Sequence, residues 1–579
     1  MIKILKNMRK KDWLLVLIIF LFVLLQVYLD LKMPDYMSEV TKLVQTENSK
    51  FNDILLNGFY MLLCAFGSLI SSFAVGFLAT YLASKFSENL RYKLFNKITS
   101  FSMAEVKEFK TDSLITRTTN DVTQIEMLIG MGLNLILKAP TTAIWAISKI
   151  LNKNFEWSAL TGVAVIVLLT VITIIMIIVI PRFKKIQKLI DKVNGLSREN
   201  INGIRVVRAF NAYNYQQDKF DKTNKELTNL QEFNQKKFAL FTPVMYLVMN
   251  SLALLIYFTG AYLISNAALN LKLDLFSDMI VFSSYALQVI ISFLMLAFIF
   301  MIVPRADVSA RRINEVLDKK VSIKEGNIVN KKDVGTVEFI NVSFKYPDAD
   351  EYILKDISFS CKKGETVAFI GSTGSGKSTL VNLIPRFYDV TDGKILVDGI
   401  DVREYKSEVL NNIIGYVSQK AVIFDDSVEE NIAYSNNVNK DKLKKAIEVS
   451  QAKDFVDKIG VSAHLSKAGT NISGGQKQRI SIARAIYKNP EIYIFDDTFS
   501  ALDYKTDLKL RKELKKYTKD ATVLIVAQRI GTIMNADKIM VLDEGKCVGV
   551  GTHKELLKTC KVYQEIAYLQ FRKEELDNA

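Results

Sequence analysis

The residues Gly371–Ser378 form the pattern G-x-x-x-x-G-K-S, which combines two glycines with a lysine and a serine. Glycines at this spacing let backbone N–H groups turn inward around a phosphate, and the N-terminus of a following helix adds a favourable dipole. We expect Lys377 to pair with the outer phosphates of a nucleotide and the Ser378 hydroxyl to bind Mg²⁺. The residues predicted to surround the phosphates are Gly371, Ser372, Thr373, Gly374, Ser375, Gly376, Lys377, Ser378 and Thr379. An apolar strand-like run, 366–370, precedes the loop and a helical run, 379–384, follows it, which is the context that a chance glycine-rich loop lacks.

A second acidic element follows another apolar run. Residues 492–495 read Ile-Tyr-Ile-Phe and lead into Asp496 and Asp497. A pair of aspartates after a strand is usually a solvated turn. With a phosphate-binding loop upstream, Asp496 is instead predicted to hold Mg²⁺ through water.

The composition separates two kinds of material in one chain. Of the 579 residues, 49% are hydrophobic and 24% are charged, and the formal net charge is +15. Such a charge is typical of chains that contact nucleic acid or anionic lipid, and the long apolar runs favour lipid, so no nucleic acid partner is expected. Four scattered cysteines and two histidines predict neither a disulfide framework nor a histidine-rich metal site.

Six apolar runs are long enough to cross the hydrocarbon core of a membrane as helices. They are residues 13–31, 57–83, 134–151, 158–180, 239–265 and 278–303. The third is the weakest because Lys138 and Pro140 interrupt it, and the first is too long for the apolar part of a cleaved signal peptide. Residues 182–237 contain thirteen Lys or Arg and residues 266–277 contain one, Lys272. The excess of positive charge places the first segment, both termini and the C-terminal half in the cytoplasm.

The order of these features predicts a membrane domain followed by a soluble one. The expected boundaries are 1–310 for an all-α six-helix transmembrane domain, 311–334 for a linker and 335–579 for an α/β nucleotide-binding domain with a largely parallel sheet. Residues 84–133 and 181–238 have helical spacing with few Gly or Pro, and we expect them to extend the spans as helices into the cytoplasm. Strands are expected at 337–340, 366–370, 413–417, 492–495, 523–526 and 538–542.

A segment between the phosphate-binding loop and the acidic pair Asp496 and Asp497 resembles a known family motif. Residues 470–485 contain Ile472 followed by Ser473, Gly474, Gly475 and Gln476. This run resembles the signature motif of ATP-binding cassette (ABC) proteins, with Ile472 in place of the more usual leucine. The resemblance implies a P-loop domain with a helical subdomain, ATP and Mg²⁺ as ligands, and a signature that closes over the γ-phosphate bound by a partner subunit.

Further matches extend the resemblance over residues 335–560 and into the membrane half. Tyr346 resembles the aromatic residue that stacks on adenine, although an ordinary edge-strand tyrosine is the alternative. Gln419 resembles the glutamine that contacts Mg²⁺, and Asp503 belongs to a segment that resembles the loop crossing the dimer interface. Residues 114–122 and 199–210 resemble the two cytoplasmic loops of the exporter branch, where they would form coupling helices against the cassettes; solvated helix faces are the alternative.

Two positions depart from the family pattern. Asp497 stands where the family usually has the glutamate that acts as general base, and Gln528 stands where it usually has histidine. The aspartate carboxylate lies about 1.5 Å closer to the backbone than a glutamate carboxylate would. A misplacement of a catalytic group by about 1 Å costs on the order of 10²-fold in rate. Asp497, Gln528 and Gln419 are the predicted catalytic residues, and we expect ATP to bind at this site but to be hydrolysed slowly. A harmless variation with normal hydrolysis is the alternative.

The resemblance and these departures together predict a function. The chain is expected to be one half of an exporter of a small molecule, drug or lipid at the plasma membrane, paired with a second half-transporter that carries the missing glutamate and histidine. A homodimeric exporter with two active sites is the alternative, and a cassette ATPase acting on DNA or ribosomes is a remote one. Lys138 is expected either to contact an anionic substrate in a cavity or to extend toward the inner headgroups.

Overall fold

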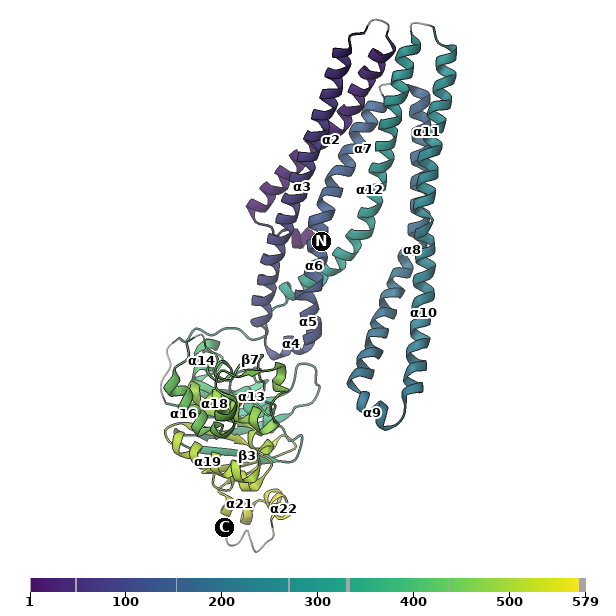
Figure 1. Ribbon diagram of the computed structural model, residues 1–579. Coiled ribbons are helices and arrows are strands. Elements are labelled where there is room, and N and C mark those ends of the chain that lie inside the picture. Colours follow the sequence, from purple (N-terminus) through teal and green to yellow (C-terminus); the bar gives the residue numbers. More distant parts are fainter. Residues whose placement is uncertain are drawn as a thin grey trace. The chain divides into compact units, whose positions relative to one another are not determined.

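The chain divides into two compact units, shown in Figure 1. The computed structural model describes residues 2–46, 49–151, 154–268, 271–329, 334–435 and 437–571. The first unit, called the membrane unit below, comprises Met1–Thr99 and Asp112–Lys319. The second, the cassette unit, comprises Ser100–Thr111 and Lys320–Ala579.

The boundary between the units differs from the predicted one. Helix α12 (Lys272–Asp318) continues through residues 311–318, which the sequence pattern assigned to the linker. A charged amphipathic segment has the same composition whether it ends a helix or forms a loop, so composition alone placed the boundary too early. Residues 330–333 of the predicted linker and 572–579 of the predicted nucleotide-binding domain lie outside the described residues.

The membrane unit contains the six predicted spans. Within the described part of the chain, six helical stretches are long and apolar enough to cross a membrane, and each contains most or all of one predicted span. They are α2 (Lys10–Gln45), α3 (Phe51–Thr99), the stretch from α5 (Thr111–Thr118) through α6 (Asn120–Met127) and the π-helical turn Leu128–Gly132 to α7 (Leu133–Leu151), α8 (Phe155–Asn202), α10 (Tyr213–Ala239) with α11 (Phe241–Asn266), and α12. Helix α7 continues past Lys138 and Pro140, the two residues that weakened the third prediction. The short helices α1 (Ile2–Leu5) and α9 (Ile204–Ala209) complete the unit.

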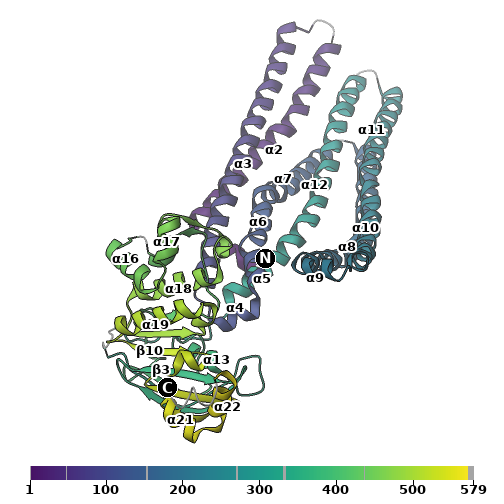
Figure 2. The same cartoon turned by 60° about the horizontal axis from the view of Figure 1, so that its bottom comes forward.

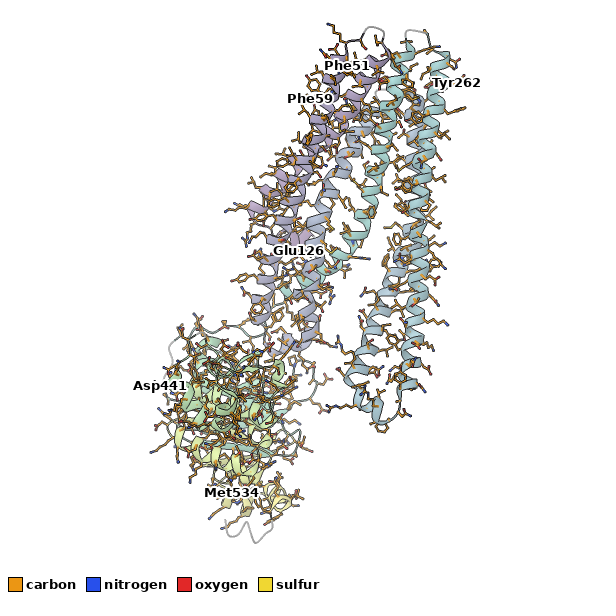
Figure 3. All side chains as sticks on the ribbon, in the orientation of Figure 1. Phe51, Phe59, Glu126, Tyr262, Asp441 and Met534 are labelled. Atoms are coloured by element: carbon orange, nitrogen blue, oxygen red, sulfur yellow. The ribbon has the colours of Figure 1, made fainter. Side chains whose placement is uncertain are left out.

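The outer surface of these helices is apolar. Phe59 on α3 and Tyr262 on α11 are 55% and 67% exposed, and both project from their helices in Figure 3. In a water-soluble bundle such residues would be buried, whereas helices in lipid satisfy their backbone internally and can expose apolar side chains. The extensions predicted for 84–133 and 181–238 are helical almost throughout, in α3, α5 and α6 and in α8, α9 and α10.

The cassette unit is built on two sheets. A six-stranded sheet has the order β12-β11-β3-β10-β9-β6, with β12 antiparallel to β11 and the other strands parallel. A four-stranded antiparallel sheet has the order β2-β1-β4-β5. The strands of these sheets are β1 (Val337–Phe344), β2 (Leu354–Cys361), β3 (Thr366–Gly371), β4 (Asp392–Val397), β5 (Ile400–Asp401), β6 (Ile414–Val417), β9 (Ile492–Asp496), β10 (Thr522–Val526), β11 (Lys538–Asp543) and β12 (Lys546–Gly551).

Every predicted strand is present, but one lies in the other sheet. The run 337–340 belongs to β1, which pairs antiparallel with β2 and β4. The remaining five form the parallel sheet, whose strands are buried on both faces. In β3, Ala368 and Ile370 pack into one apolar cluster while Val367 and Phe369 pack into a second, as expected of a sheet covered on both sides.

Helices cover the sheet and form a separate group beside it. Figure 2 shows α16, α17 and α18 gathered on one side of the strands β3 and β10. The helices of the unit are α4 (Met103–Phe109), α13 (Lys377–Leu383), α14 (Ser407–Ile413), α15 (Val428–Ala433), α16 (Lys440–Val449), α17 (Lys453–Ile459), α18 (Gly474–Lys488), α19 (Tyr504–Tyr517), α20 (Ile530–Ile533), α21 (His553–Thr559) and α22 (Lys561–Gln570). A two-stranded pair, β7 (Asp426–Ser427) and β8 (His464–Leu465), lies within the helical group.

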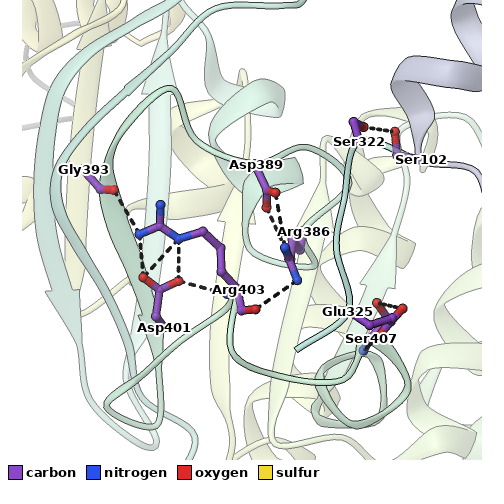
Figure 4. Close-up of polar contacts among 9 residues, drawn as sticks. All are labelled: Ser102, Ser322, Glu325, Arg386, Asp389, Gly393, Asp401, Arg403 and Ser407. Carbon is purple, nitrogen blue, oxygen red and sulfur yellow. Dashed lines mark hydrogen bonds and ion pairs between the residues drawn. The ribbon is translucent and has the colours of Figure 1, made fainter. Parts of the chain in front are cut away.

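One segment of the first cytoplasmic loop belongs to the cassette unit, and a coupling role for residues 114–122 stays a prediction. Residues 114–122 lie in α5 and α6 of the membrane unit, whereas Ser100–Thr111, with helix α4, groups with the cassette. Polar contacts hold this segment and the residues after Lys320 in place (Figure 4). The Glu105 carboxylate accepts hydrogen bonds from the backbone N–H groups of Ser102 (2.8 Å) and Ser322 (3.0 Å).

The residues after Lys320 are packed against the cassette. The Glu325 carboxylate accepts hydrogen bonds from the backbone N–H (2.9 Å) and hydroxyl (2.7 Å) of Ser407. Ile328 donates its backbone N–H to the Glu404 carbonyl at 2.9 Å. A Cβ atom added at Gly326 would lie 2.1 Å from the Glu404 carbonyl oxygen, so this close approach of two backbones requires glycine.

We predict that Gly326→Ala detaches this segment from the cassette. The added methyl group cannot fit without moving backbone, a kind of overpacking that costs about 1–3 kcal/mol. Limited proteolysis of the purified full-length protein should therefore cleave faster near residues 320–329, and its Tm should fall. The matched control is Gly531→Ala, whose added methyl would sit at an ordinary 3.4 Å from the Phe571 ring. Equal proteolysis of both variants would contradict the packing described here.

Candidate functional site

The phosphate-binding loop starts at the end of the central strand β3. The chain leaves β3 at Gly371, turns through the loop and enters α13 at Lys377. Gly376 has φ of +94°, and a Cβ atom there would lie 2.8 Å from Leu354 Cδ2. Glycine adopts this backbone conformation at no steric cost. The sequence therefore folds locally into the open loop that its motif predicts.

Lys377 is a buried cation at the base of this loop. Its side chain donates hydrogen bonds to the carbonyl oxygens of Gly371 (2.9 Å) and Ser372 (2.6 Å), and the residue is 9% exposed. Burial lowers the pKa of Lys377, because it disfavours the charged form. A phosphate group would supply the anion that offsets this penalty, so the residues present fit a nucleotide.

Ser378 and Asp496 form a pair of oxygen ligands across the site. The Ser378 hydroxyl donates a hydrogen bond of 2.7 Å to Asp496 Oδ1. Hydroxyl and carboxylate oxygens are the ligands that Mg²⁺ accepts, and burial raises the pKa of Asp496, a penalty that a bound cation would relieve. Ser378 and Asp496 would hold the Mg²⁺ ion predicted from the sequence, and the ion would neutralise charge on the phosphates.

The three residues predicted to be catalytic meet at one atom. Gln419 Nε2 lies 3.0 Å from Asp497 Oδ2, and Gln528 Nε2 lies 2.8 Å from the same oxygen. Burial raises the pKa of Asp497, while the hydrogen bonds from the amide groups act in the opposite direction. Gln419, predicted also as a metal ligand, is thus engaged with Asp497 beside the pair formed by Ser378 and Asp496.

Strand register explains this convergence. Val526 of β10 lies beside Asp496 of β9, and Val417 of β6 lies beside Phe495 of β9. Gln528 and Gln419 each follow their strand by two residues, at the same edge of the parallel sheet as Asp497. The three side chains therefore come from neighbouring strand ends.

Tyr346 lies at the margin of the loop. Its hydroxyl is 3.1 Å from the Thr379 hydroxyl, and its ring meets the ring of Tyr388 edge-on at 5.2 Å. The Lys107 ammonium of α4 lies 5.4 Å from the centroid of the Tyr346 ring and 2.9 Å from the Asp348 carboxylate. Adenine stacking on Tyr346 stays a prediction. Lys107 was missed because nothing in a sequence indicates that a residue 241 positions away contacts Asp348.

The signature residues form the start of helix α18. The Ser473 hydroxyl accepts a hydrogen bond from the Gln476 backbone N–H (3.3 Å), and the Gln476 side chain accepts one from the Ser473 backbone (2.8 Å). Ser473 and Gly474 are exposed, and Gly475 and Gln476 are half-buried. Asp503 is exposed and caps α19 by accepting from the Thr506 backbone N–H at 3.0 Å. A role for the signature and Asp503 at a second subunit stays a prediction.

Tyr416 is a further member of the site. Its hydroxyl lies 2.8 Å from the Asn382 amide oxygen and 3.3 Å from Asp496 Oδ2. Tyr416 is paired with Ile494, two residues before Asp496. Because alternate residues of a strand point to the same face, this register places Tyr416 and Asp496 on one side of the sheet. The position of Tyr416 near the end of the predicted strand 413–417, three residues before Gln419, was the signal that could have identified it.

Two protein families match separate parts of the chain. The family described as ABC transporter transmembrane region matches residues 16–294, and the family described as ABC transporter matches residues 354–500. An uncharacterized ABC transporter ATP-binding protein of Mycobacterium bovis is 38% identical over 88% of this chain and 86% of its own length. The uncharacterized ABC transporter ATP-binding protein YfiB of Bacillus subtilis is 37% identical over 88% of this chain and 89% of its own length.

Two further comparisons concern export. A Staphylococcus aureus protein named "Putative multidrug export ATP-binding/permease protein" is 42% identical over 44% of this chain and 45% of its own length. A solved structure of a bacterial Atm1-family ABC exporter with ATP bound aligns with a TM-score of 0.81, covering 96% of this chain and 99% of that chain at 23% identity. At that identity the structural match establishes the fold.

We predict that Tyr416→Phe weakens Mg²⁺-dependent nucleotide binding. Removing a hydroxyl that positions Asp496 costs roughly 0.5–1.5 kcal/mol, or about two- to tenfold in affinity. Titration of the purified protein with Mg·ATP measures this change. The control is Tyr493→Phe on β9, because the Tyr493 hydroxyl is buried without a hydrogen-bond partner among the described residues. Indistinguishable affinities for the two variants would remove Tyr416 from the site.

Proposed function

Because the chain belongs to the ABC transporter family, whose transmembrane region and ATP-binding domain it carries in one polypeptide, we propose that it is one subunit of a heterodimeric exporter. ABC exporters generally work as dimers that couple ATP hydrolysis to transport. In this proposal the chain exports a small molecule, drug or lipid across the plasma membrane. Its own nucleotide site, built from the phosphate-binding loop, Asp496 and Asp497, binds ATP and hydrolyses it slowly.

The observation that carries the proposal is the surroundings of Asp497. Two amide groups, from Gln419 and Gln528, donate to the same carboxylate oxygen at 3.0 and 2.8 Å. These hydrogen bonds oppose the rise that burial gives to the pKa of Asp497, and they occupy the oxygen that would abstract a proton. The carboxylate is also one methylene shorter than glutamate, so it falls short of a water that a longer side chain would reach. A general base must first be within reach of the proton it abstracts.

Binding does not depend on that base. The phosphate-binding loop, Lys377, Ser378 and Asp496 retain the residue types that grip a magnesium nucleotide. Magnesium, when bound, supplies positive charge against the phosphate oxygens. Gln528 can donate a hydrogen bond to a γ-phosphate, but it cannot carry the positive charge of a protonated histidine. The site is therefore suited to hold ATP through several turnovers of a second site.

The second site is formed with the partner in this proposal. Ser473–Gln476 retain the pattern of an intact signature and would complete a nucleotide site whose glutamate and histidine belong to the other subunit. ATP then closes the two cassettes and turns the transport cavity outward. The shift of this equilibrium is limited by how much more tightly ATP binds the closed state than the open one. Hydrolysis at the partner's site resets the transporter. Residues 199–210 and the first cytoplasmic loop would transmit the motion.

We predict unequal roles for the two sites of the native assembly, purified through a tag on this chain. Asp497→Ala should leave steady-state ATP hydrolysis within about twofold, whereas removing the corresponding acid of the partner should abolish it. The double variant Asp497→Glu with Gln528→His should raise hydrolysis at this site, by up to about 10²-fold if a 1 Å misplacement is what limits it.

The control for this experiment is Lys377→Ala, which should prevent nucleotide binding at the same site. A single kind of polypeptide in the purified assembly, with vigorous hydrolysis that Asp497→Ala silences, would instead establish the homodimeric exporter with two active sites. ATP hydrolysis by a chain that partitions outside the membrane fraction would favour the cassette ATPase without transport.

We also predict the orientation in the membrane. The excess of Lys and Arg in 182–237 over 266–277 favours a cytoplasmic nucleotide-binding domain and cytoplasmic termini. In a background with Cys64, Cys361, Cys547 and Cys560 replaced by Ser, an impermeant thiol reagent should label Lys272→Cys in intact cells. Arg208→Cys should be labelled only after permeabilisation. The reverse pattern would invert the topology.

A further inference from the structure

The membrane unit contains a cavity of about 430 Å³ between α2, α3, α7 and α12, four helices that lie together in Figure 1. Its volume falls within the range of roughly 300–1,000 Å³ that small-molecule sites have. Much of the wall is apolar, and four thioethers line it: Met33, Met37, Met61 and Met295. Methionine side chains are flexible and polarizable, so such a wall adapts to apolar groups of differing shape.

One ion pair interrupts this apolar wall. Lys138 Nζ on α7 lies 3.3 Å from Asp30 Oδ2 on α2, and the two side chains are 20% and 30% exposed. Strong ammonium–carboxylate hydrogen bonds are shorter, about 2.7–2.9 Å. The Lys138 ammonium has three donors, and Asp30 is the acceptor that the described residues bring within reach of it. The structure therefore places Lys138 on the cavity wall with hydrogen-bonding capacity to spare.

Polar groups around the pair are also incompletely satisfied. Thr142 lies one turn after Lys138 and lines the cavity; it is 9% exposed, and its hydroxyl has no hydrogen-bond partner among the described residues. The Gln288 amide reaches the Asp30 backbone oxygen only at 3.4 Å. Buried polar groups are normally hydrogen-bonded, and unpaired ones call for an explanation. A polar ligand group seated beside Lys138 would supply the missing partners.

Asp30 also accepts a hydrogen bond of 2.5 Å from the Ser68 hydroxyl at its other carboxylate oxygen, so Lys138 is its charged partner and Ser68 its neutral one. A second ion pair between the same two helices has closer charged partners. Asp35 on α2 lies 2.8 Å from Lys149 on α7 and 3.4 Å from Lys32, and it accepts a hydrogen bond of 2.5 Å from the Tyr285 hydroxyl. Its carboxylate is well supplied with donors, and it is not part of the cavity wall. The ion pair of Asp35 and Lys149 thus joins α2 to α7 away from the cavity wall, and it serves as a control for the pair of Asp30 and Lys138.

The charge balance of the wall decides which ligands fit. A ligand with a single negative charge would draw Lys138 away and leave Asp30 with the Ser68 hydroxyl but without an opposite charge. A cation would take Asp30 from Lys138 in the same way. The pair is partly buried, so leaving one charge without its partner is unfavourable. A zwitterion supplies a partner to each member at once, and its apolar remainder would pack on the methionines.

We propose that this cavity binds an amphipathic zwitterion, with its anionic group on Lys138 and Thr142 and its cationic group on Asp30. The proposal rests on the proposed export function and names the chemical class of its substrate. Head-group charge fixes the recognition, while the tail is held loosely. Compounds that carry an ammonium and a carboxylate or phosphate at short separation on an apolar chain belong to this class.

Four ten-carbon probes that differ only in the head group test the proposal. They are 2-aminodecanoic acid (zwitterion), decanoic acid (anion), decylamine (cation) and decanol (neutral). Each is titrated against ATP hydrolysis by the native assembly in lipid nanodiscs, below the concentration at which probe micelles form. The zwitterion should act at a concentration at least tenfold below those of the other three. Equal or stronger action by the anion, the cation or the alcohol would overturn the proposal.

Two variants locate the effect in the cavity. Lys138→Met and Asp30→Asn should each raise the half-maximal concentration of 2-aminodecanoic acid about tenfold, and should leave that of decanol unchanged. The control Lys149→Met should leave both half-maximal concentrations unchanged, because Lys149 pairs with Asp35 away from the cavity wall. An unaltered zwitterion response in Lys138→Met and Asp30→Asn would overturn the site. Should either variant fail to fold, the order of the four probes on the wild-type assembly still decides the question.

The proposed function fails in a different way. Wild-type assembly that hydrolyses ATP but responds to none of the four probes overturns the zwitterion site and leaves the exporter standing. Wild-type assembly that neither binds nor hydrolyses ATP overturns the exporter itself, and the site with it.

Discussion

Burial works against every charge in the nucleotide site. It lowers the pKa of Lys377 and raises the pKa values of Asp496 and Asp497, so an ammonium and two carboxylates are all held in surroundings that favour their neutral forms. A magnesium nucleotide carries both signs of charge, so its phosphates can pair with the ammonium and its Mg²⁺ ion can offset the carboxylates. The loop, the strand register and the amide groups of Gln419 and Gln528 are arranged around this one requirement.

The membrane unit meets the same constraint within apolar helices. Charged residues in such helices persist when they pair with one another or face a polar cavity. Asp35 satisfies this condition fully through Lys149, Lys32 and Tyr285. Asp30 has the Ser68 hydroxyl as a close neutral donor and Lys138 as a more distant charged partner, and Lys138 keeps donors to spare. The two halves of the molecule therefore use one principle, in which an under-compensated charge marks the place where a ligand completes the structure.

Features set by local chemistry could be predicted from the sequence. Apolar length predicts the six spans, and the glycines, Lys377 and Ser378 predict the phosphate-binding loop, because each depends on residues that are neighbours in the chain. Features set by pairing could not be predicted. The residues of a strand such as 337–340 do not indicate which sheet the strand joins. Nothing in the sequence around Lys138 indicates that Asp30, 108 residues away, is its partner. The convergence of Gln419, Asp497 and Gln528 was expected from resemblance, and register supplies its physical cause.

The segment Ser100–Thr111 has a consequence for handling the protein in parts. In the sequence it lies between two membrane spans, but in the structure it is packed into the cassette unit, where the Glu105 carboxylate accepts a hydrogen bond from the Ser322 backbone N–H. A soluble fragment that begins at residue 320 would lack α4, so the Ser322 amide would lose Glu105 and the ring of Tyr346 would lose Lys107. Nucleotide affinities measured on such a fragment would describe a truncated pocket, so faithful biochemistry of the ATPase requires the membrane-embedded polypeptide.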